Sequence, residues 1–354
     1  MSNEIFGRLK SAGAKDEPGF LVDDNARWIA RKDDKDASLM ADAEVTILPL
    51  GMRSFASRIS FDGERYFCFS GLPVPDFLPD GFEQISATPG LFGAVFVNAD
   101  LPVTATAAEI RDAIEEQHRG VEGYQGHDLQ TVLDLFQEVD FFRVASGADS
   151  IFLESLERVC GSYCARGYPG YPLGLSSMTL SSITELFESG HDTLPYHLPL
   201  QGLLSYTWPA FYLELYRCIE QLYSVPRLQV LRKRLAHAGP IAELASTLES
   251  IISWRPREQE SLSAILSKIS EGRRASILSS FSLSADTVPT ATGHNCAEKI
   301  YQLRNAHVHF RPALSAPLIS AEEWDRIIYT MCVTVIEVYD LFGDIYTGNS
   351  LDMA

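Results

Sequence analysis

The clearest indication of the fold is the stretch Phe55-Ala-Ser-Arg-Ile-Ser-Phe61-Asp62-Gly63-Glu-Arg-Tyr66-Phe-Cys-Phe69. Apolar and polar residues alternate up to Phe61, and this is the two-residue period of a half-buried strand. Asp62-Gly63 follows, and an apolar run resumes at Tyr66. Asp-Gly between two such runs is the strongest short-range sign of a β-hairpin. The sequence therefore predicts a hairpin that turns at residues 62 and 63.

The rest of the first 100 residues is also expected to be β-rich. Glu44 to Leu50 and Leu91 to Val97 are predicted strands, and prolines break the remaining segments into loops. From about residue 104 the apolar period becomes helical, and Thr106-x-x-Glu109 is a capping box that begins a helix. Later helices are expected at Leu129–Phe142, Ile151–Cys164, Ser177–Glu188, Leu203–Tyr223, Leu228–Ala238, Ile241–Ser253, Glu258–Ser270, Cys296–Phe310 and Ala321–Phe342.

These patterns predict an α+β chain of two domains. A Pro/Gly-rich break, Gly190 to Pro199, precedes the long apolar helices, so we expect the boundary near residue 195. Residues 1–195 would form an acidic, mixed α/β domain, and residues 196–354 an all-α bundle. The stretch 255–293 resembles an insertion, because it is longer than a minimal bundle needs.

Composition points to a soluble, cytoplasmic protein with no membrane segment. Hydrophobic residues make up 46% of the chain, yet no uninterrupted apolar stretch is as long as a membrane span requires, which is roughly 18 residues or more. The first 15 residues are polar and do not resemble a secretory signal. The six cysteines are expected to be reduced and to pack as small apolar residues.

The net charge of −18 is unevenly distributed. Residues 1–195 contain 15 Lys+Arg and 31 Asp+Glu, whereas residues 227–311 contain 12 and 7. A non-specific nucleic-acid binder is normally basic overall. This pattern instead favours a regulated enzyme with a local basic cleft in its C-terminal half.

The candidate site lies in the stretch Tyr301-Gln-Leu-Arg-Asn-Ala-His-Val-His-Phe-Arg-Pro312. On a helix, Arg304 and His307 share one face, whereas His309 is turned from Arg304 by about 140°. Both histidines can reach one cleft with Arg304 only near a frayed helix end or across an interface. Pro312 favours such an end, because the residue before proline avoids the α-helical region.

Arginine and histidine are the side chains that metal-free RNA cleavage requires. The ribose 2′-OH attacks the adjacent phosphate, an imidazole moves protons to or from the reacting oxygens, and a guanidinium stabilises the charged transition state. Asn305 would orient either group, or the phosphate, by hydrogen bonds. The products would be a 2′,3′-cyclic phosphate and a 5′-hydroxyl, and the reaction would need neither a metal nor a cofactor.

Two other Arg/His pairs have similar spacings. Arg232 precedes His237 by the same interval, and Arg111 precedes His118 by a slightly longer one. We interpret both as solvated helix faces. Carboxylates lie inside the second pair and would repel phosphate, and the lysine that follows the first arginine is a poor orienting residue.

The residues Leu303 to Pro312 resemble the signature of the HEPN superfamily (higher eukaryotes and prokaryotes nucleotide-binding). Its ribonuclease members carry an Arg, a polar residue, and a His four to six residues beyond the Arg, which map onto Arg304, Asn305 and His309. One long final helix follows the motif, as the pattern from Trp324 to Phe342 does here. The resemblance covers about residues 196–345.

This resemblance implies a small α-bundle that pairs so that two motifs line one composite cleft, and we expect a homodimer or a higher homo-oligomer. It implies RNA, including tRNA or other host RNA, as substrate, and a role as a toxin or effector in antiphage defence. An acidic residue near the site is also implied, and Leu215-Tyr-Arg-Cys-Ile-Glu-Gln-Leu-Tyr223 resembles the helix that would supply it, as Glu220.

Several alternatives remain open on the sequence. Arg304 could form a buried ion pair, and His307 or His309 could be a core histidine. His307 could be the acid/base in place of His309. Arg311 could add phosphate affinity or be a cation at a helix C-terminus.

The C-terminal domain could also be a non-catalytic module for dimerisation or RNA binding. The N-terminal domain could then be the sensor of a protein or ligand. If the C-terminal domain is a ribonuclease, the acidic N-terminal domain could bind a protein trigger or inhibitor. It could also cover the basic cleft and keep the nuclease inactive.

Overall fold

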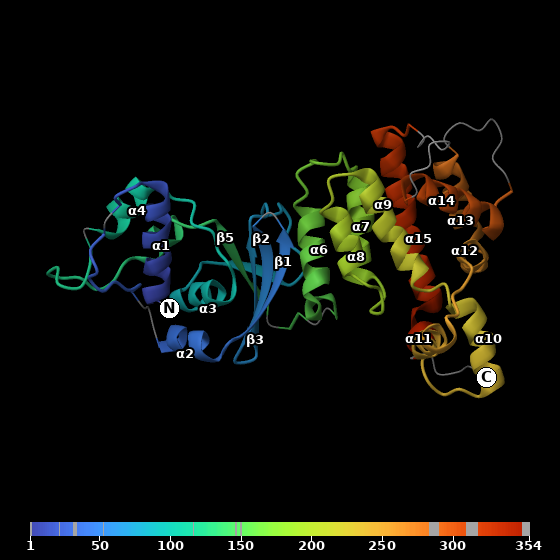
Figure 1. Cartoon of the computed structure of the whole chain (residues 1–354), viewed down its shortest axis with the longest axis horizontal. Coiled ribbons are helices and arrows are strands. Elements are labelled where there is room, and N and C mark those ends of the chain that lie inside the picture. Colours follow the sequence, from blue (N-terminus) through green and yellow to red (C-terminus); the bar gives the residue numbers. More distant parts are fainter. Residues whose placement is uncertain are drawn as a thin grey trace. The chain divides into compact units, whose positions relative to one another are not determined.

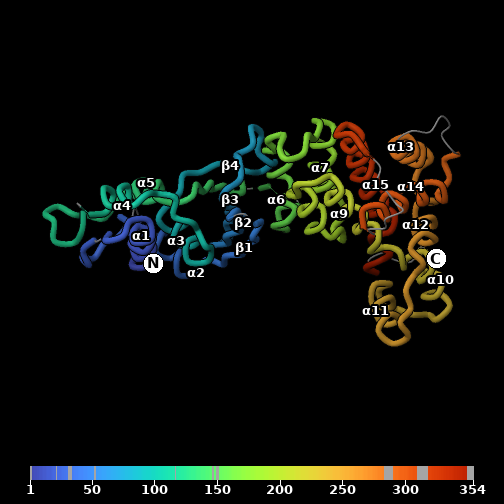
Figure 2. Tube along the Cα trace, turned by 45° about the horizontal axis from the view of Figure 1, so that its top comes forward, coloured from blue at the N-terminus to red at the C-terminus, as the bar shows by residue number. Residues whose placement is uncertain are grey.

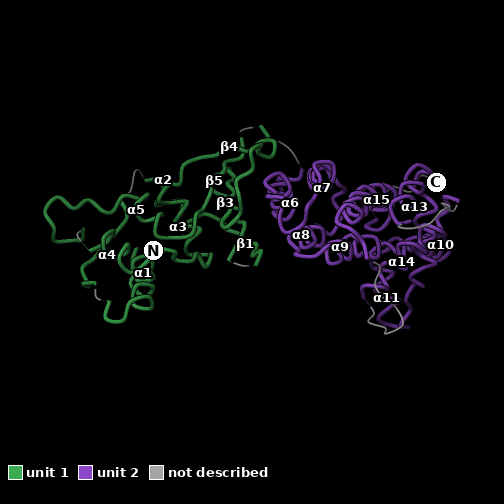
Figure 3. The backbone as a smooth tube through the Cα atoms, turned by 90° about the horizontal axis from the view of Figure 1, so that it is seen from above, with its two compact units in different colours: residues 1–150 green, residues 151–354 purple. Residues whose placement is uncertain are grey.

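The computed structural model describes residues 2–20, 22–30, 34–51, 53–115, 117–145, 147–148, 151–282, 290–308 and 318–348. The chain divides into two compact units, residues 1–150 and 151–354 (Figure 3). The first unit contains a five-stranded antiparallel sheet, and the second consists of helices. The chain is therefore α+β, with its β-structure in the N-terminal part, as the sequence predicts.

The predicted hairpin is confirmed. β2 (Ser54–Phe61) pairs antiparallel with β3 (Glu64–Ser70), and Phe61 lies opposite Glu64. Asp62 and Gly63 form the two-residue turn with φ angles of 49° and 74°. Positive φ at both central residues matches the right-handed twist of paired strands, which explains why Asp-Gly occupies the turn. β1 (Glu44–Gly51), also predicted, adds to the outer side of β2.

The sheet has the order β1-β2-β3-β5-β4, completed by β4 (Phe82–Ile85) and β5 (Val139–Val144). The largest apolar cluster of this unit joins strand residues such as Phe55 and Cys68 to α1 (Ser2–Asp16), α2 (Asp34–Asp42) and α3 (Pro89–Asn98). Figure 1 shows α3 close to the strands. α4 (Ala107–Ile114) begins at the predicted capping box, in which the Thr106 and Glu109 side chains each accept a hydrogen bond from the other residue's backbone N–H.

Two predictions for this unit are wrong. Leu91 to Val97 is not a strand but part of α3, whose N-cap is Thr88 and whose first residue is Pro89. Thr followed by Pro is a helix-start signal. A short segment that is apolar on every side shows no helical or strand period, so its hydrophobic pattern cannot distinguish a helix from a strand. Leu129 to Phe142 is not one helix: α5 (Leu129–Leu133) is short, and β5 then pairs with two strands.

The second unit is built around α15 (Ala321–Thr347), whose buried face extends from Trp324 to Gly343. α7 (Ser177–Ser189), α9 (Trp208–Glu220), α11 (Ile241–Ile252) and α13 (Glu271–Phe281) all pack against it. α14 (Gly293–Val308) packs on both α12 (Glu258–Leu266) and α13 (Figure 2). The remaining elements are η1 (Ile151–Glu154), α6 (Leu156–Arg166), α8 (His197–Leu203) and α10 (Val225–Leu235).

The units divide after residue 150, earlier than the boundary expected near 195. The reason is that α6 and α7 belong to the second bundle. α7 packs on α15, and the backbone N–H of Ser176, just before α7, donates to Asp325 Oδ1 at 3.0 Å. The Gly190 to Pro199 break is therefore a turn within this unit.

Three further differences lie in the second unit. The helix expected from Ile151 is η1 followed by α6. The helix expected over Leu203–Tyr223 is shorter, because α8 ends at Leu203 and α9 begins only at Trp208-Pro209 and ends at Glu220. The stretch 255–293, interpreted as an insertion, contains α12 and α13. α13 packs on α14 and α15 through buried Ile277, Leu278 and Phe281, so it belongs to the core of the bundle.

The cysteines agree with the sequence interpretation. All six are buried and none forms a disulfide. No helix in the described ranges is both long enough and apolar enough to cross a membrane.

Candidate functional site

Arg304 and Asn305 lie in the last turns of α14. The apolar face of this helix carries Cys296, Ile300 and Leu303, which are buried where α14 packs on α12 and α13. Arg304 follows Ile300 by four residues and so lies at the edge of this face, and its side chain is only 16% exposed. The Arg304 guanidinium donates a hydrogen bond to Asn305 Oδ1 at 3.0 Å. The structure therefore brings together two of the three residues that the motif predicts.

Aromatic rings and a carboxylate surround the Arg304 guanidinium. Its carbon lies 5.7 Å from the ring centre of Tyr216 on α9 and 5.9 Å from that of Tyr301 on α14. These are cation–π distances. Glu258 Oε2, at the start of α12, lies 3.8 Å from Arg304 Nη1, which is an ion pair beyond hydrogen-bond length. The α-bundle thus contacts Arg304 from three helices.

Glu220, the acidic residue implied by the resemblance, belongs to the same cluster. It is the last residue of α9 and is half-buried. Burial, and then the negative charge of Glu258, raises the pKa of Glu220, while the charges of Arg304 and Arg217 lower it. A carboxyl group with a raised pKa beside a guanidinium is able to hold or release a proton.

A pair of buried tyrosines fixes this end of α9. The Tyr223 hydroxyl donates to the Tyr216 hydroxyl at 2.9 Å. Burial raises the pKa of Tyr216 to about 12, so its hydroxyl stays protonated at neutral pH. On the preceding turn, the Tyr212 hydroxyl donates to the Ile300 carbonyl at 2.7 Å and ties α9 to α14. These contacts hold the ring of Tyr216 against Arg304.

His307 lies on the next part of α14 and contacts a different neighbour. Its ring packs on Trp324 at the start of α15, with the ring centres 5.4 Å apart. Burial lowers the pKa of His307, which favours the neutral imidazole. Its Nε2 atom is buried and has no hydrogen-bond partner in the part of the chain that the structure describes. His309 and Arg311 lie outside the described residues.

A pocket of about 480 Å³ adjoins the cluster, and both Glu220 and Glu258 line it. Trp254 and Arg255, from the segment between α11 and α12, line it as well. The pocket therefore presents both signs of charge next to Arg304, together with an indole ring on which a base could stack.

The basic stretch 227–311 is partly neutralised by ion pairs. Arg257 lies 2.9 Å from Glu260, which also pairs with Arg227. Arg273 lies 3.2 Å from Glu337 on α15. The local positive charge is thus smaller than the sequence balance implies, and Arg304 is one of several arginines with a carboxylate neighbour.

The two alternative Arg/His pairs differ in their surroundings. Arg111 pairs with Glu17 at 3.1 Å, as expected of a solvated helix face. Arg232 and His237 lie on either side of the end of α10 and line a separate pocket of about 480 Å³. The second pair therefore needs an experimental comparison with Arg304.

Sequence reasoning missed Glu258, Tyr216 and Tyr223 as members of the site. The aromatic pattern of α9 was the available signal for the tyrosines, and it predicted only a core face. Nothing near Glu258 in the sequence marks it. No group of three or more His, Cys, Asp or Glu side chains within the described ranges is arranged to hold a metal ion.

Comparisons with protein-family models, with curated proteins and with solved structures each return no match for this chain. The interpretation of the site therefore rests on its own geometry and on the resemblance of its motif.

Proposed function

We propose that the helical unit is a metal-independent endoribonuclease of the HEPN type. The observation that carries the proposal is the Arg304–Asn305 pair, held at the end of α14 by a 3.0 Å hydrogen bond and flanked by Glu220, Glu258 and Tyr216. Phosphodiester transesterification needs a cation that stabilises the charged phosphate, a group that orients it, and titratable groups that move protons. Residues of these kinds lie within one helical turn of Arg304 or in contact with it.

Each residue has a distinct role in the proposed reaction. Arg304 binds the scissile phosphate and stabilises its charge as the 2′-OH attacks, and the planar guanidinium can contact two phosphate oxygens. Asn305 orients Arg304 through their hydrogen bond. His309 or His307 moves the proton, and the lowered pKa of His307 suits the base that accepts it from the 2′-OH. The leaving 5′-oxygen receives a proton, and the RNA ends in a 2′,3′-cyclic phosphate.

The resemblance extends the proposal to biology. Two copies of the chain would pair so that both motifs line one cleft, and host RNA such as tRNA would be cut. That activity would suit an effector or toxin of antiphage defence in the cytoplasm. The acidic first unit would be the place for a protein trigger or inhibitor, in keeping with its 13 Lys+Arg against 26 Asp+Glu in residues 1–150.

The test is cleavage of total tRNA in EDTA by the wild type and by Arg304→Ala, Asn305→Ala, His307→Ala and His309→Ala. Removing one preorganised donor to a transition-state charge costs about 10²- to 10³-fold in rate, so Arg304→Ala should be inactive in practice. Arg232→Ala is the matched control, because it loses the same charge in the other Arg/His pair. Loss of cleavage in Arg232→Ala with Arg304→Ala still active would place the site elsewhere.

A second candidate is a non-catalytic module for dimerisation or RNA binding. The observation that favours it is the position of Arg304 between Glu258 and Tyr216, which also describes a structural ion pair. For such a module, the wild type binds tRNA without cutting it, both as the full chain and as residues 151–354. Arg304→Ala would then lower the melting temperature, and neither it nor the wild type would cleave RNA.

A further inference from the structure

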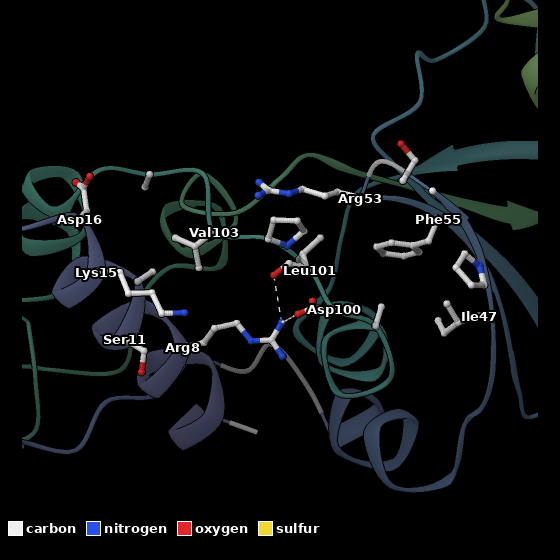
Figure 4. Close-up of a pocket in the computed structure, with 17 residues that line it drawn as sticks. Arg8, Ser11, Lys15, Asp16, Ile47, Arg53, Phe55, Asp100, Leu101 and Val103 are labelled. Atoms are coloured by element: carbon white, nitrogen blue, oxygen red, sulfur yellow. Dashed lines mark hydrogen bonds and ion pairs between the residues drawn. The ribbon is translucent and has the colours of Figure 1, made fainter. Parts of the chain in front are cut away.

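A pocket in the first unit has a volume of about 750 Å³. It lies between α1, the turn from β1 to β2, and the segment 99–105 (Figure 4). Pockets that take small organic ligands have volumes of roughly 300–1,000 Å³ and combine apolar walls with a few polar groups. This pocket is independent of the Arg304 cluster, which belongs to the other unit.

Three basic side chains from different segments surround the pocket: Arg8 and Lys15 from α1, and Arg53 from the β1–β2 turn. Figure 4 shows their charged ends directed into the same space. This clustering runs against the composition of the unit, in which acidic residues outnumber basic ones by two to one. A concentration of positive charge in an acidic unit indicates an anionic occupant.

The Arg8 side chain is held in place at the pocket by three contacts. Its guanidinium lies 3.3 Å from Asp100 Oδ1, donates to the Leu101 carbonyl at 3.2 Å and stacks on Phe96 with 4.4 Å between the guanidinium carbon and the ring centre. The second carboxylate at the pocket, Asp16, accepts the backbone N–H of Ala107 at 2.8 Å. Both acidic groups that line the pocket thus have partners from the protein.

Lys15 and Arg53 differ from Arg8 in this respect. Within the described ranges, neither side chain has an ion-pair or hydrogen-bond partner. Arg53 also has a φ angle of 71°, in the left-handed region that non-glycine residues rarely occupy. Its carbonyl accepts a hydrogen bond from Gln137 Nε2 at 3.1 Å, which helps to hold this turn. Backbone conformations of this kind cluster at active sites and ligand-binding segments.

Apolar side chains line the pocket as well. Ile47 and Phe55 lie on the strand side, and Leu101 and Val103 lie on the opposite wall (Figure 4). Phe55 is nearly fully buried, so its ring is a fixed surface. An occupant would therefore place a flat apolar body between these walls and its charged group beside the cations.

We infer that this pocket binds a small organic phosphate, with the phosphate beside Lys15 and Arg53 and an apolar ring against Phe55 and Val103. Two cations without partners match the double negative charge of a phosphate monoester better than the single charge of a carboxylate. Arg and Lys side chains are also suited to phosphate oxygens by their donor geometry and charge.

The experiment is isothermal titration of the full chain with 1-naphthyl phosphate, which combines a flat apolar ring with a phosphate monoester. Inorganic phosphate and 1-naphthol supply each half alone, and 1-naphthoate replaces the phosphate by a carboxylate. We expect 1-naphthyl phosphate to bind most tightly of the four. Lys15→Ala and Arg53→Ala should each weaken its binding by about 10-fold or more, the usual loss for one charged hydrogen bond.

Arg119→Ala is the matched control, because Arg119 is an exposed cation of the same unit that does not line the pocket. Wild-type binding in Arg119→Ala, with unchanged melting temperatures in all three variants, would support the inference. No binding of 1-naphthyl phosphate, equal binding of 1-naphthoate, or equal losses in Arg119→Ala and the pocket variants would overturn it. None of these results depends on RNA cleavage, so the inference and the proposed nuclease fail or stand separately.

Discussion

Charge and aromatic packing act together on Arg304. Tyr216 and Tyr301 contact the guanidinium, and Glu258 and Glu220 balance its charge. A guanidinium is weakly hydrated, so it tolerates this half-buried position better than a lysine ammonium would. The same contacts reduce the number of rotamers open to the side chain, which is what an enzyme needs in order to present a cation to a phosphate without reorganisation.

At the residue scale, His307 should make stability depend on pH. Burial lowers its pKa from the value of 6.5 that it has in an unfolded chain. Between the two pKa values the unfolded state binds more protons, so stability is full above pH 6.5 and falls as the pH decreases toward the folded-state pKa. We expect the melting temperature of the helical unit to fall between pH 7.5 and 5.5, and to fall less in His307→Gln.

Differential scanning calorimetry at both pH values makes this measurement. His127 in the first unit also has a pKa lowered by burial, but it is present in both proteins and its effect cancels in the comparison. An equal pH dependence in the wild type and His307→Gln would show that His307 is not held in its neutral form.

The residues of the site could be predicted only in part. Arg304 and Asn305 are neighbours in the sequence, so their pairing needed no tertiary information, and Glu220 followed from the resemblance of its helix. His307 comes from the same part of α14 but packs on Trp324. Glu258 comes from another helix, and its approach to Arg304 depends on how α12 packs on α14. The residues around Glu258 in the sequence do not indicate that it contacts Arg304. The strained turn at Arg53 was missed for the same reason, since it is defined by strand register.

At the element scale, the close contact of α6 with α7 depends on a glycine. A Cβ atom at Gly161 would lie 2.2 Å from a ring carbon of Phe187, which is fully buried and packs on Tyr196. Since the ring has little room to move, Gly161→Ala should destabilise the helical unit by about 1–3 kcal/mol.

Gly272→Ala in α13 is the matched control, because a Cβ atom there meets nothing within 4 Å. It should leave the stability unchanged or raise it by up to about 1 kcal/mol. Urea unfolding followed by circular dichroism compares the two variants. Equal stability of Gly161→Ala and Gly272→Ala would mean that α6 and α7 do not pack as described.

Elements were predictable where their ends carried specific signals. The Asp62-Gly63 turn and the capping box at Thr106 both lie where the sequence placed them. The wrong predictions concern segments whose secondary structure is decided by the tertiary neighbours on which they pack. Leu129 to Phe142 shows enough helical period to mislead, yet Val139 to Val144 lies between β3 and β4 and satisfies its backbone hydrogen bonds in the sheet.

At the scale of the whole molecule, the structure assigns residues 151–195 to the helical unit. A fragment of residues 151–354 keeps the packing of α7 on α15 and should unfold in one cooperative transition. A fragment of residues 196–354 lacks α7, whose buried residues include Ile183 and Leu186, and so exposes the face of α15 on which α7 packs. Because apolar surface is then exposed to water, its unfolding transition should be broader and its melting temperature lower. Equal melting curves for the two fragments would place the boundary near 195 after all.

The division into units also bears on control of the proposed nuclease. Acidity is concentrated in residues 1–150, while arginines of the helical unit are already paired with its own carboxylates. The helical unit therefore does not need the first unit to balance its charge. If the first unit restrains cleavage, residues 151–354 should cut RNA faster than the full chain does.

The most direct measurement of the central claim is cleavage of one RNA in two forms, with all ribose 2′-hydroxyls free and with all of them methylated. The reactions contain EDTA and use both the full chain and residues 151–354, and the product ends are analysed by mass spectrometry. We expect cleavage of the free form alone, with 2′,3′-cyclic phosphate and 5′-hydroxyl ends, and none by Arg304→Ala. Cleavage of the methylated RNA, or no cleavage of the free RNA by either protein, would contradict the central claim.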